Sequence, residues 1–177
     1  MEQVGQFRVL FVCVGNVCRS PLGERLLRVR LPEDRFAVSS AGVNALEGAP
    51  ISPDTVVELT ARGGRADGFV ARRLVDDMLH EADLVLVATR QLRSRVLAET
   101  PSALRRTFTV REFAALLDEV DSDDPREIVA QAADLRSRAR LTDYDIPDPF
   151  QRGPEAQAHA ATLMAEAVDR IAKGLDR

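Results

Sequence analysis

Four short apolar runs alternate along the chain with longer segments of helical spacing. The runs span residues 7–13, 36–40, 84–88 and 107–110. The first and third are apolar at successive positions and rich in β-branched residues, which is typical of strands buried on both faces of a parallel sheet. We predict four strands, the second of them stopped by Ala41-Gly42.

The first helical segment follows directly on the first strand. Pro21 suits a first helical turn, where the missing N–H of proline costs no hydrogen bond. Leu22, Leu26 and Val29 recur at i, i+4 and i+7, so we predict that they lie on the buried face of a helix ending near Pro32.

Helix start and stop signals predict six further helices. They are expected between Ser52-Pro53 and Gly63-Gly64, over 75–81, over 92–98, directly after the fourth strand, from Asp124-Pro125 and from near Pro154. The residues expected on their buried faces are Val56, Leu59, Thr60, Phe113, Leu116, Leu117, Ile128, Ala132, Leu135, Leu163, Ala167, Ile171 and Leu175. Strands alternating with helices predict an α/β fold, a parallel sheet with helices on both faces.

Length and charge narrow the class of protein. The 177 residues fit one domain, and the net charge of −4 does not favour nucleic acid or an anionic membrane as a partner. The two cysteines lie five residues apart, which is not a secreted disulfide framework, so we expect a cytoplasmic protein. We expect no signal peptide, because Met1 leads almost directly into the first strand, and no membrane span, because the apolar runs are too short. Neither His80 nor His159 has a partner at ligand spacing, and we expect no metal and no cofactor.

A short loop joins the first strand to the first helix, and this succession of strand, loop and helix start is typical of an anion-binding site. The stretch reads Cys13-Val14-Gly15-Asn16-Val17-Cys18-Arg19-Ser20-Pro21. Backbone N–H groups of such a loop and of the first helical turn point at a common centre. We therefore expect phosphate to be bound by Val14, Gly15, Asn16, Val17, Cys18 and Ser20.

The side chains of this loop suit attack on the bound phosphate. A helix N-terminus and a neighbouring arginine favour the thiolate form, so Cys13 is the candidate nucleophile. Arg19 can hold two phosphate oxygens with its planar fork. Ser20 can donate to the thiolate, Asn16 can hold the loop through its side chain, and Gly15 permits a sharp turn.

Other interpretations of the loop fit the residues less well. An isolated cysteine is most often a small core residue, but this one stands among the polar residues of an anion loop. The chain has no Gly-Lys-Ser/Thr sequence, which argues against a nucleotide-binding P-loop, and no second cysteine pair for zinc.

Residues 13–21 resemble the signature of the low-molecular-weight protein tyrosine phosphatases, C-x5-R-S. Ser40-Ala41-Gly42, Ala71-Arg72-Arg73-Leu74, residues 82–87 and Asp148-Pro149-Phe150 also match the pattern of that family, in the same order. The resemblance covers most of the chain and is strongest to the bacterial branch. It implies a flavodoxin-like, three-layer fold with a four-stranded parallel sheet, and hydrolysis of phosphotyrosine through a phosphocysteine.

The resemblance also implies further site residues. Asp148 would be the general acid, since it directly precedes Pro149-Phe150; Asp145 in the same loop is its competitor. Leu46 and Phe150 would form apolar walls. Val17 favours phosphotyrosine, because the phosphoarginine-specific branch carries threonine there.

The resemblance implies a phosphotyrosine protein as substrate, a bacterial tyrosine autokinase as the opposing enzyme, and a monomer or weak dimer.

We expect a single phosphatase domain spanning residues 1–177. The segment near 119–142 is longer than in the family pattern, and we interpret it as an insertion that is either a surface excursion or a lid. The alternatives are a thiol-coupled arsenate reductase, a phosphoarginine phosphatase and a non-catalytic phosphate-binding module. A reversible disulfide between Cys18 and Cys13 is a further hypothesis.

Overall fold

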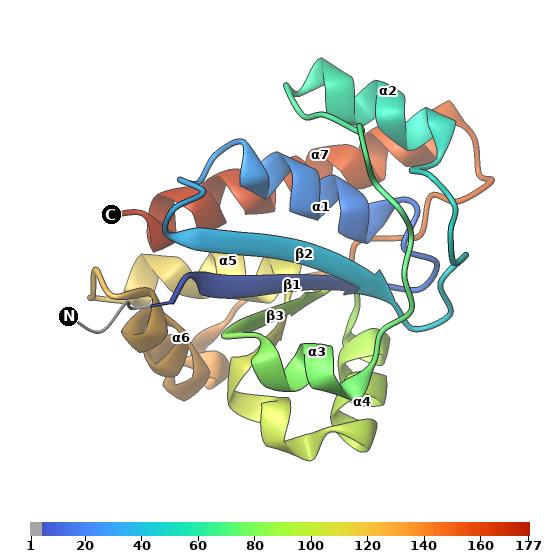
Figure 1. Cartoon of the computed structure of the whole chain (residues 1–177). Coiled ribbons are helices and arrows are strands. Elements are labelled where there is room, and N and C mark those ends of the chain that lie inside the picture. Colours follow the sequence, from blue (N-terminus) through green and yellow to red (C-terminus); the bar gives the residue numbers. More distant parts are fainter. Residues whose placement is uncertain (1–4) are drawn as a thin grey trace.

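A single parallel sheet organises the computed structural model, which describes residues 5–177 (Figure 1). Its strands are β1 (Phe7–Cys13), β2 (Phe36–Gly42), β3 (Leu84–Val87) and β4 (Thr107–Thr109). They lie in the order β2-β1-β3-β4, and all neighbouring pairs are parallel. The predicted α/β fold with four parallel strands is confirmed.

The helices lie on both faces of this sheet (Figure 1). They are α1 (Arg19–Arg28), α2 (Pro53–Ala61), α3 (Asp76–Glu81), α4 (Arg90–Glu99), α5 (Val110–Leu116), α6 (Pro125–Asp134) and α7 (Pro154–Leu175). Three short 3₁₀ turns are η1 (Pro101–Arg106), η2 (Leu117–Glu119) and η3 (Arg136–Arg138). None of the helices within residues 5–177 combines the length and the apolar composition needed to cross a membrane.

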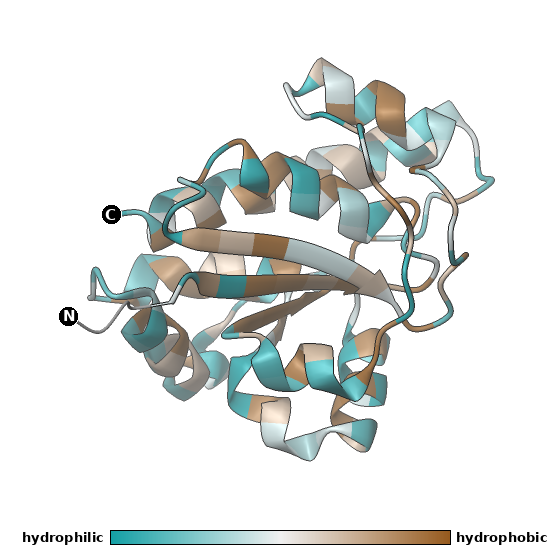
Figure 2. Cartoon of the chain, viewed as in Figure 1, coloured by the Kyte–Doolittle hydropathy of each residue, from teal (hydrophilic) through white to brown (hydrophobic). Residues whose placement is uncertain are grey.

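Alternate residues of β1 enter two separate cores. Phe7, Val9 and Phe11 pack in the cluster that holds buried residues of α1, α5 and α7. Leu10 and Val12 pack in the smaller cluster with residues of α3 and α4. Figure 2 shows hydrophobic residues along the central strands, as expected of a strand covered on both faces.

Three details of the sequence prediction are wrong. Ala41 and Gly42 do not stop β2 but belong to it, because their backbone continues the ladder with β1 as far as the pair Cys13–Gly42. Val29 is 52% exposed, since it follows the last residue of α1. Thr60 is exposed, and the buried residues of α2 are Thr55 and Leu59.

The strand order determines where a ligand site forms. The chain leaves β1 toward β2 on one side, and β3 lies on the other, so the carboxyl end of β1 is the switch point of the sheet. Ligands of open parallel sheets bind in the crevice at this point. Cys13 is the last residue of β1.

Candidate active site

The loop from Cys13 to Ser20, here called the nucleophile loop, is anchored by its carbonyl groups. The carbonyls of Cys13, Val14 and Gly15 accept hydrogen bonds of 2.9–3.0 Å from the N–H groups of Val43, Asn44 and Leu46. The carbonyl of Val17 accepts a bond of 2.9 Å from Ser52. The N–H of a trans peptide points opposite to its carbonyl, so the N–H groups that follow these carbonyls face away from the segment 43–46.

The N–H groups of residues 14–18 have no hydrogen-bond partner among residues 5–177. The Nε atom of Arg19 is likewise buried and has no hydrogen-bond partner within this part of the chain. The residue as a whole is 4% exposed. Asn16, Val17 and Cys18 are buried residues, and buried donors without acceptors are costly. Their gathering in one loop indicates that the loop is built to bind an anion.

The thiol of Cys13 lies at the base of this loop. Its Sγ atom is 2.9 Å from Oγ of Ser20, and the residue is 2% exposed. Nδ2 of Asn16 donates to Oγ of Ser20 and to Oγ of Ser40, each at 2.9 Å. Because Asn16 donates to the Ser20 oxygen, the Ser20 hydrogen can point at the sulfur or at the carbonyl of Ala41, which lies 3.5 Å away. Its bond to the thiolate stays a prediction.

Asn16 holds the sharpest turn of the loop. Its φ of 56° lies in the left-handed region, which asparagine tolerates better than most residues. Its Oδ1 accepts the N–H of Arg72 at 2.9 Å. The backbone beside it leaves no room for a side chain at Gly42, where a Cβ would lie 2.5 Å from the carbonyl oxygen of Val14.

Residues 143–150, here called the acid loop, lie beside the nucleophile loop and form no helix or strand. Ile146, fully buried, is the anchor. Its N–H donates to the carbonyl of Ala88 at 2.9 Å, at the end of β3, and its carbonyl accepts Nη1 of Arg19 at 2.8 Å. The arginine of one loop therefore also positions the other loop.

Asp148 is the carboxylate of the acid loop that faces the thiol pocket. Its Oδ2 lies 3.6 Å from Nη2 of Arg19, and its Oδ1 accepts the N–H of Phe150 at 3.1 Å. Its side chain is 51% exposed.

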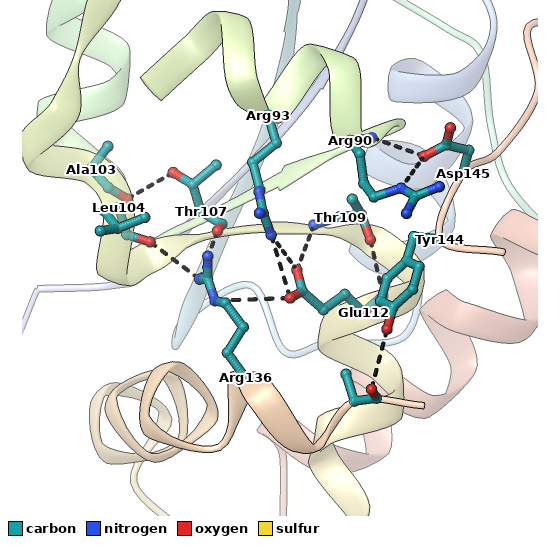
Figure 3. A network of polar contacts seen from close by, with 11 residues as sticks. Arg90, Arg93, Ala103, Leu104, Thr107, Thr109, Glu112, Arg136, Tyr144 and Asp145 are labelled. Carbon is teal, nitrogen blue, oxygen red and sulfur yellow. Dashed lines mark hydrogen bonds and ion pairs between the residues drawn. The ribbon is translucent and has the colours of Figure 1, made fainter. Parts of the chain in front are cut away.

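Asp145 points the other way, toward α4 (Figure 3). Its Oδ1 accepts the N–H of Arg90 at 2.8 Å, and its carbonyl accepts Nη1 of Arg111 at 3.4 Å. Of the two candidate acids, Asp148 alone lines the pocket of Cys13. Asp145 instead ties the loop to the start of α4.

A pocket of about 140 Å³ brings together the predicted site residues except Asn16 and Ser20, whose side chains bond to each other within the loop. It is lined by Cys13, Val14, Gly15, Val17, Cys18, Arg19, Asn44, Leu46, Asp148 and Phe150. Leu46 and Phe150 are 47% and 39% exposed, so they stand at its mouth, whereas Cys13 lies at its buried end. An arrangement of thiol, guanidinium and carboxyl around one cavity can attack a phosphate ester and protonate its leaving group.

Cys18 has different surroundings from Cys13. Nε2 of Gln157, at the start of α7, lies 3.8 Å from its Sγ. Burial is the main cause that raises the pKa of the Cys18 thiol, and the neighbouring Cys13 raises it further. Both cysteines are free thiols, so their reversible disulfide stays a hypothesis.

The segment 119–142 folds onto β4 and α5 by charged contacts (Figure 3). Nη2 of Arg136 donates to the carbonyl of Thr107 at 2.9 Å, and its Nε lies 3.8 Å from the buried carboxylate of Glu112. Its guanidinium also lies 4.3 Å from the ring centroid of Phe108. The segment thus contains α6 and η3, and its interpretation as an insertion stays a prediction.

Several residues that support the site were given no role from the sequence, although Ser40 and Arg72 stand in segments that match the family pattern. Ser40 and Arg72 hold Asn16, Asn44 lines the pocket, and Gln157 donates to the carbonyl of Pro149 at 3.4 Å. Ser40 precedes the end of β2, so the rule that ligands lie at the carboxyl ends of strands was the available signal. His80 and His159 are exposed on α3 and α7.

Comparisons with known proteins agree with this geometry. The family model described as "Low molecular weight phosphotyrosine protein phosphatase" matches residues 8–132. The chain is 29% identical to the low molecular weight protein-tyrosine-phosphatase Etp of Escherichia coli K12 over 177 residues, which cover all of both chains. It is 30% identical over 170 residues to the protein-arginine-phosphatase of Geobacillus stearothermophilus, covering 96% of each.

Solved structures match over nearly the whole chain. The tyrosine phosphatase Wzb from Escherichia coli K30, in complex with sulphate, superposes with a TM-score of 0.74 at 25% identity, covering 94% of this chain and 96% of that one. The YwlE arginine phosphatase from Geobacillus stearothermophilus superposes with a TM-score of 0.72 at 29% identity, covering 94% and 91%.

Proposed function

The chain belongs to the low molecular weight phosphotyrosine protein phosphatase family, and on that premise we propose that it hydrolyses phosphotyrosine in proteins through a phosphocysteine. The observation that carries the proposal is the single pocket lined by Cys13, Arg19 and Asp148, although Asp148 is far from the other two in the sequence. Each of these side chains supplies one part of the reaction.

In the first step, the Cys13 thiolate attacks phosphorus. A phosphorus–sulfur bond forms as the bond from phosphorus to the tyrosine oxygen breaks, and Asp148 gives its proton to that oxygen. Arg19 and the N–H groups of residues 14–18, which have no partner within residues 5–177, hold the three non-bridging oxygens, where charge increases in the transition state.

In the second step, water attacks phosphorus and the phosphorus–sulfur bond breaks. Asp148, now ionised, accepts a proton from the water, and inorganic phosphate leaves. The hydroxyl of Ser20, 2.9 Å from the sulfur, stabilises the departing thiolate by donating a hydrogen bond.

An aryl phosphate fits this pocket better than a phosphorylated serine. Cys13 is 2% exposed at the closed end, and Leu46 and Phe150 supply apolar surface at the mouth. A long, flat side chain can reach the sulfur while its ring contacts these two residues. The short side chain of phosphoserine would have to draw peptide backbone into the pocket.

Phosphoarginine is the second candidate, because one relative is named a protein-arginine-phosphatase. Val17 argues against it, since the pocket offers no threonine hydroxyl there. Among the lining residues, Asp148 is the one carboxylate that could face the guanidinium of phosphoarginine, and it lies 3.6 Å from Arg19.

A panel of phosphotyrosine, phosphoarginine and phosphoserine peptides tests the proposal. We expect the wild type to release phosphate fastest from phosphotyrosine, without dependence on added metal, and the Cys13→Ser variant to be inactive. The Asp148→Ala variant should bind phosphotyrosine peptide with slow turnover. Faster release from phosphoarginine, or turnover that survives in Cys13→Ser, would contradict the proposal.

The proposal extends to the location of the reaction, the source of the substrate and the oligomeric state. We place the reaction in the cytoplasm, because both cysteines are free thiols. A tyrosine kinase would produce the substrate, since only such an enzyme forms phosphotyrosine. We treat residues 1–177 as one domain that acts as a monomer or weak dimer.

A further inference from the structure

A second cavity adjoins the catalytic pocket on the side of α4. Its volume is about 370 Å³, and four of its lining residues also line the catalytic pocket: Val14, Arg19, Asn44 and Asp148. The rest of its wall comes from the start of α4 and the residue before it: Thr89, Gln91, Leu92 and Arg95. A peptide whose phosphorylated side chain enters the first cavity therefore brings neighbouring residues to the second.

The two cavities differ in chemistry. The mouth of the catalytic pocket is apolar at Leu46 and Phe150. The wall on α4 is polar, with Thr89, Gln91 and Arg95 facing the second cavity. Oγ1 of Thr89 accepts the N–H of Leu92 at 3.1 Å, which leaves its hydroxyl hydrogen available to a ligand.

Arg95 differs from the other arginines of α4 in having no carboxylate partner among residues 5–177. Arg90 pairs with Asp145 at 3.8 Å, and Arg93 pairs with Glu112 at 3.2 Å. The guanidinium of Arg95 is exposed and makes one hydrogen bond, to the Oδ1 of Asn44 at 3.3 Å. A neutral amide is a weak partner for a cation, so this contact leaves its charge uncompensated.

Of the two arginines that line the second cavity, Arg95 is the one available to bind a second anion. Arg19 lies 3.6 Å from Asp148, and in the proposed reaction it holds the phosphate of the substrate. A second negative group, one or a few residues from the phosphotyrosine, would then meet Arg95 and the hydrogen-bond donors of Thr89 and Gln91.

We propose that this second cavity is a subsite for an acidic side chain, a carboxylate or a second phosphate, flanking the phosphotyrosine. Arg95 is its specificity-determining residue. The inference rests on the proposed function, because the first cavity must hold the phosphotyrosine for the second to hold its neighbour. It names the class of peptide that the phosphatase prefers: phosphotyrosine in an acidic segment.

Phosphotyrosine peptides with one aspartate moved through the three positions on either side of the tyrosine, in an alanine background, test this proposal. At one or more positions we expect aspartate to raise kcat/KM by about two- to fivefold through KM, the range of an exposed ion pair. The gain should disappear in Arg95→Ala, and Arg95→Glu should prefer lysine at the same position. Raising the salt concentration should reduce the gain in the wild type.

Arg105→Ala is the matched control, because it removes the same charge from an exposed arginine on η1, which pairs with Asp134 instead. The Arg105→Ala variant should keep the full preference for aspartate. The wild type and the Arg95→Ala, Arg95→Glu and Arg105→Ala variants should all hydrolyse p-nitrophenyl phosphate equally. The subsite alone would be overturned if aspartate raised kcat/KM of the wild type at no position, or if the increase persisted in Arg95→Ala. No turnover of any phosphotyrosine peptide would overturn the proposed function and the subsite with it.

Discussion

The nucleophile loop and the acid loop meet at one pocket but are held in different ways. In the nucleophile loop, Cys13, Asn16 and Ser20 are buried, and their side chains are hydrogen-bonded to one another. In the acid loop, the side chain of Asp148 is 51% exposed, and the anchor is the backbone of Ile146.

The difference separates two tasks. The sulfur must stay at a fixed place beneath the phosphate, which a short loop between a strand and a helix achieves with neighbouring residues. The acid must protonate a leaving group and then accept a proton from water, so contact with solvent suits it. The acid loop is therefore placed by contacts across the fold, to Arg19, Ala88 and Arg90.

Replacing the nucleophile should have the largest effect. Cys13→Ser should lower kcat by about 10⁴- to 10⁶-fold, because a serine hydroxyl at neutral pH is not ionised. The thermal midpoint should change little, since serine is of similar size and Ser20 remains as its hydrogen-bond partner. Phosphate release and circular dichroism measure the two quantities; a folded variant with wild-type turnover would contradict the role of Cys13.

Removing the acid should have the next largest effect, and its size should depend on the leaving group. Asp148→Ala should lower kcat for phosphotyrosine about 10²- to 10⁴-fold. The loss should be much smaller for p-nitrophenyl phosphate, because nitrophenolate leaves without a proton. An equal loss on both substrates would indicate that Asp148 only binds substrate.

Asn16 tests how far the nucleophile loop depends on its internal hydrogen bonds. Asn16→Ala removes the partners of Ser20, Ser40 and the N–H of Arg72, which we expect to cost about 1–3 kcal/mol of folding free energy. We also expect kcat to fall about tenfold. Asn16→Gly is the control, since glycine adopts the φ of 56° freely: full recovery in that variant would show that backbone strain, not lost hydrogen bonds, is responsible.

Asp145 tests the tether of the acid loop. Asp145→Ala removes the acceptor of the Arg90 N–H and should lower kcat for phosphotyrosine about threefold, equivalent to less than about 1 kcal/mol. Turnover of p-nitrophenyl phosphate should stay unchanged, since the acid matters little there. Asp134→Ala removes an equally charged exposed side chain and should change neither; a loss on both substrates in Asp145→Ala would argue for general destabilisation instead.

Cys18 should matter least for turnover. Burial raises the pKa of the Cys18 thiol, so it stays protonated at neutral pH and does not compete with Cys13 as a nucleophile. Cys18→Ala should therefore change kcat by less than about twofold. If the disulfide hypothesis holds, peroxide inactivation of this variant should no longer be reversed by added thiol, whereas that of the wild type should be. Equal recovery in both proteins would end the hypothesis.

Local sequence determined most of the fold and the nucleophile loop. The strands, the position of Cys13 at the end of β1 and the roles of Asn16 and Ser20 as hydrogen-bonding residues follow from neighbours along the chain. The apolar runs decide which segments are buried, and a strand followed by a helix start decides which way the intervening N–H groups face.

Tertiary structure alone decided the rest of the site. Three contacts join residues far apart in the chain: Ser40 and Arg72 with Asn16, Arg19 with the carbonyl of Ile146, and Arg95 with Asn44 beside the pocket. The error at Thr60 has the same origin, since this residue of α2 has helical spacing but faces solvent. Periodicity describes one segment at a time, whereas burial and charge pairing depend on which other segments pack against it.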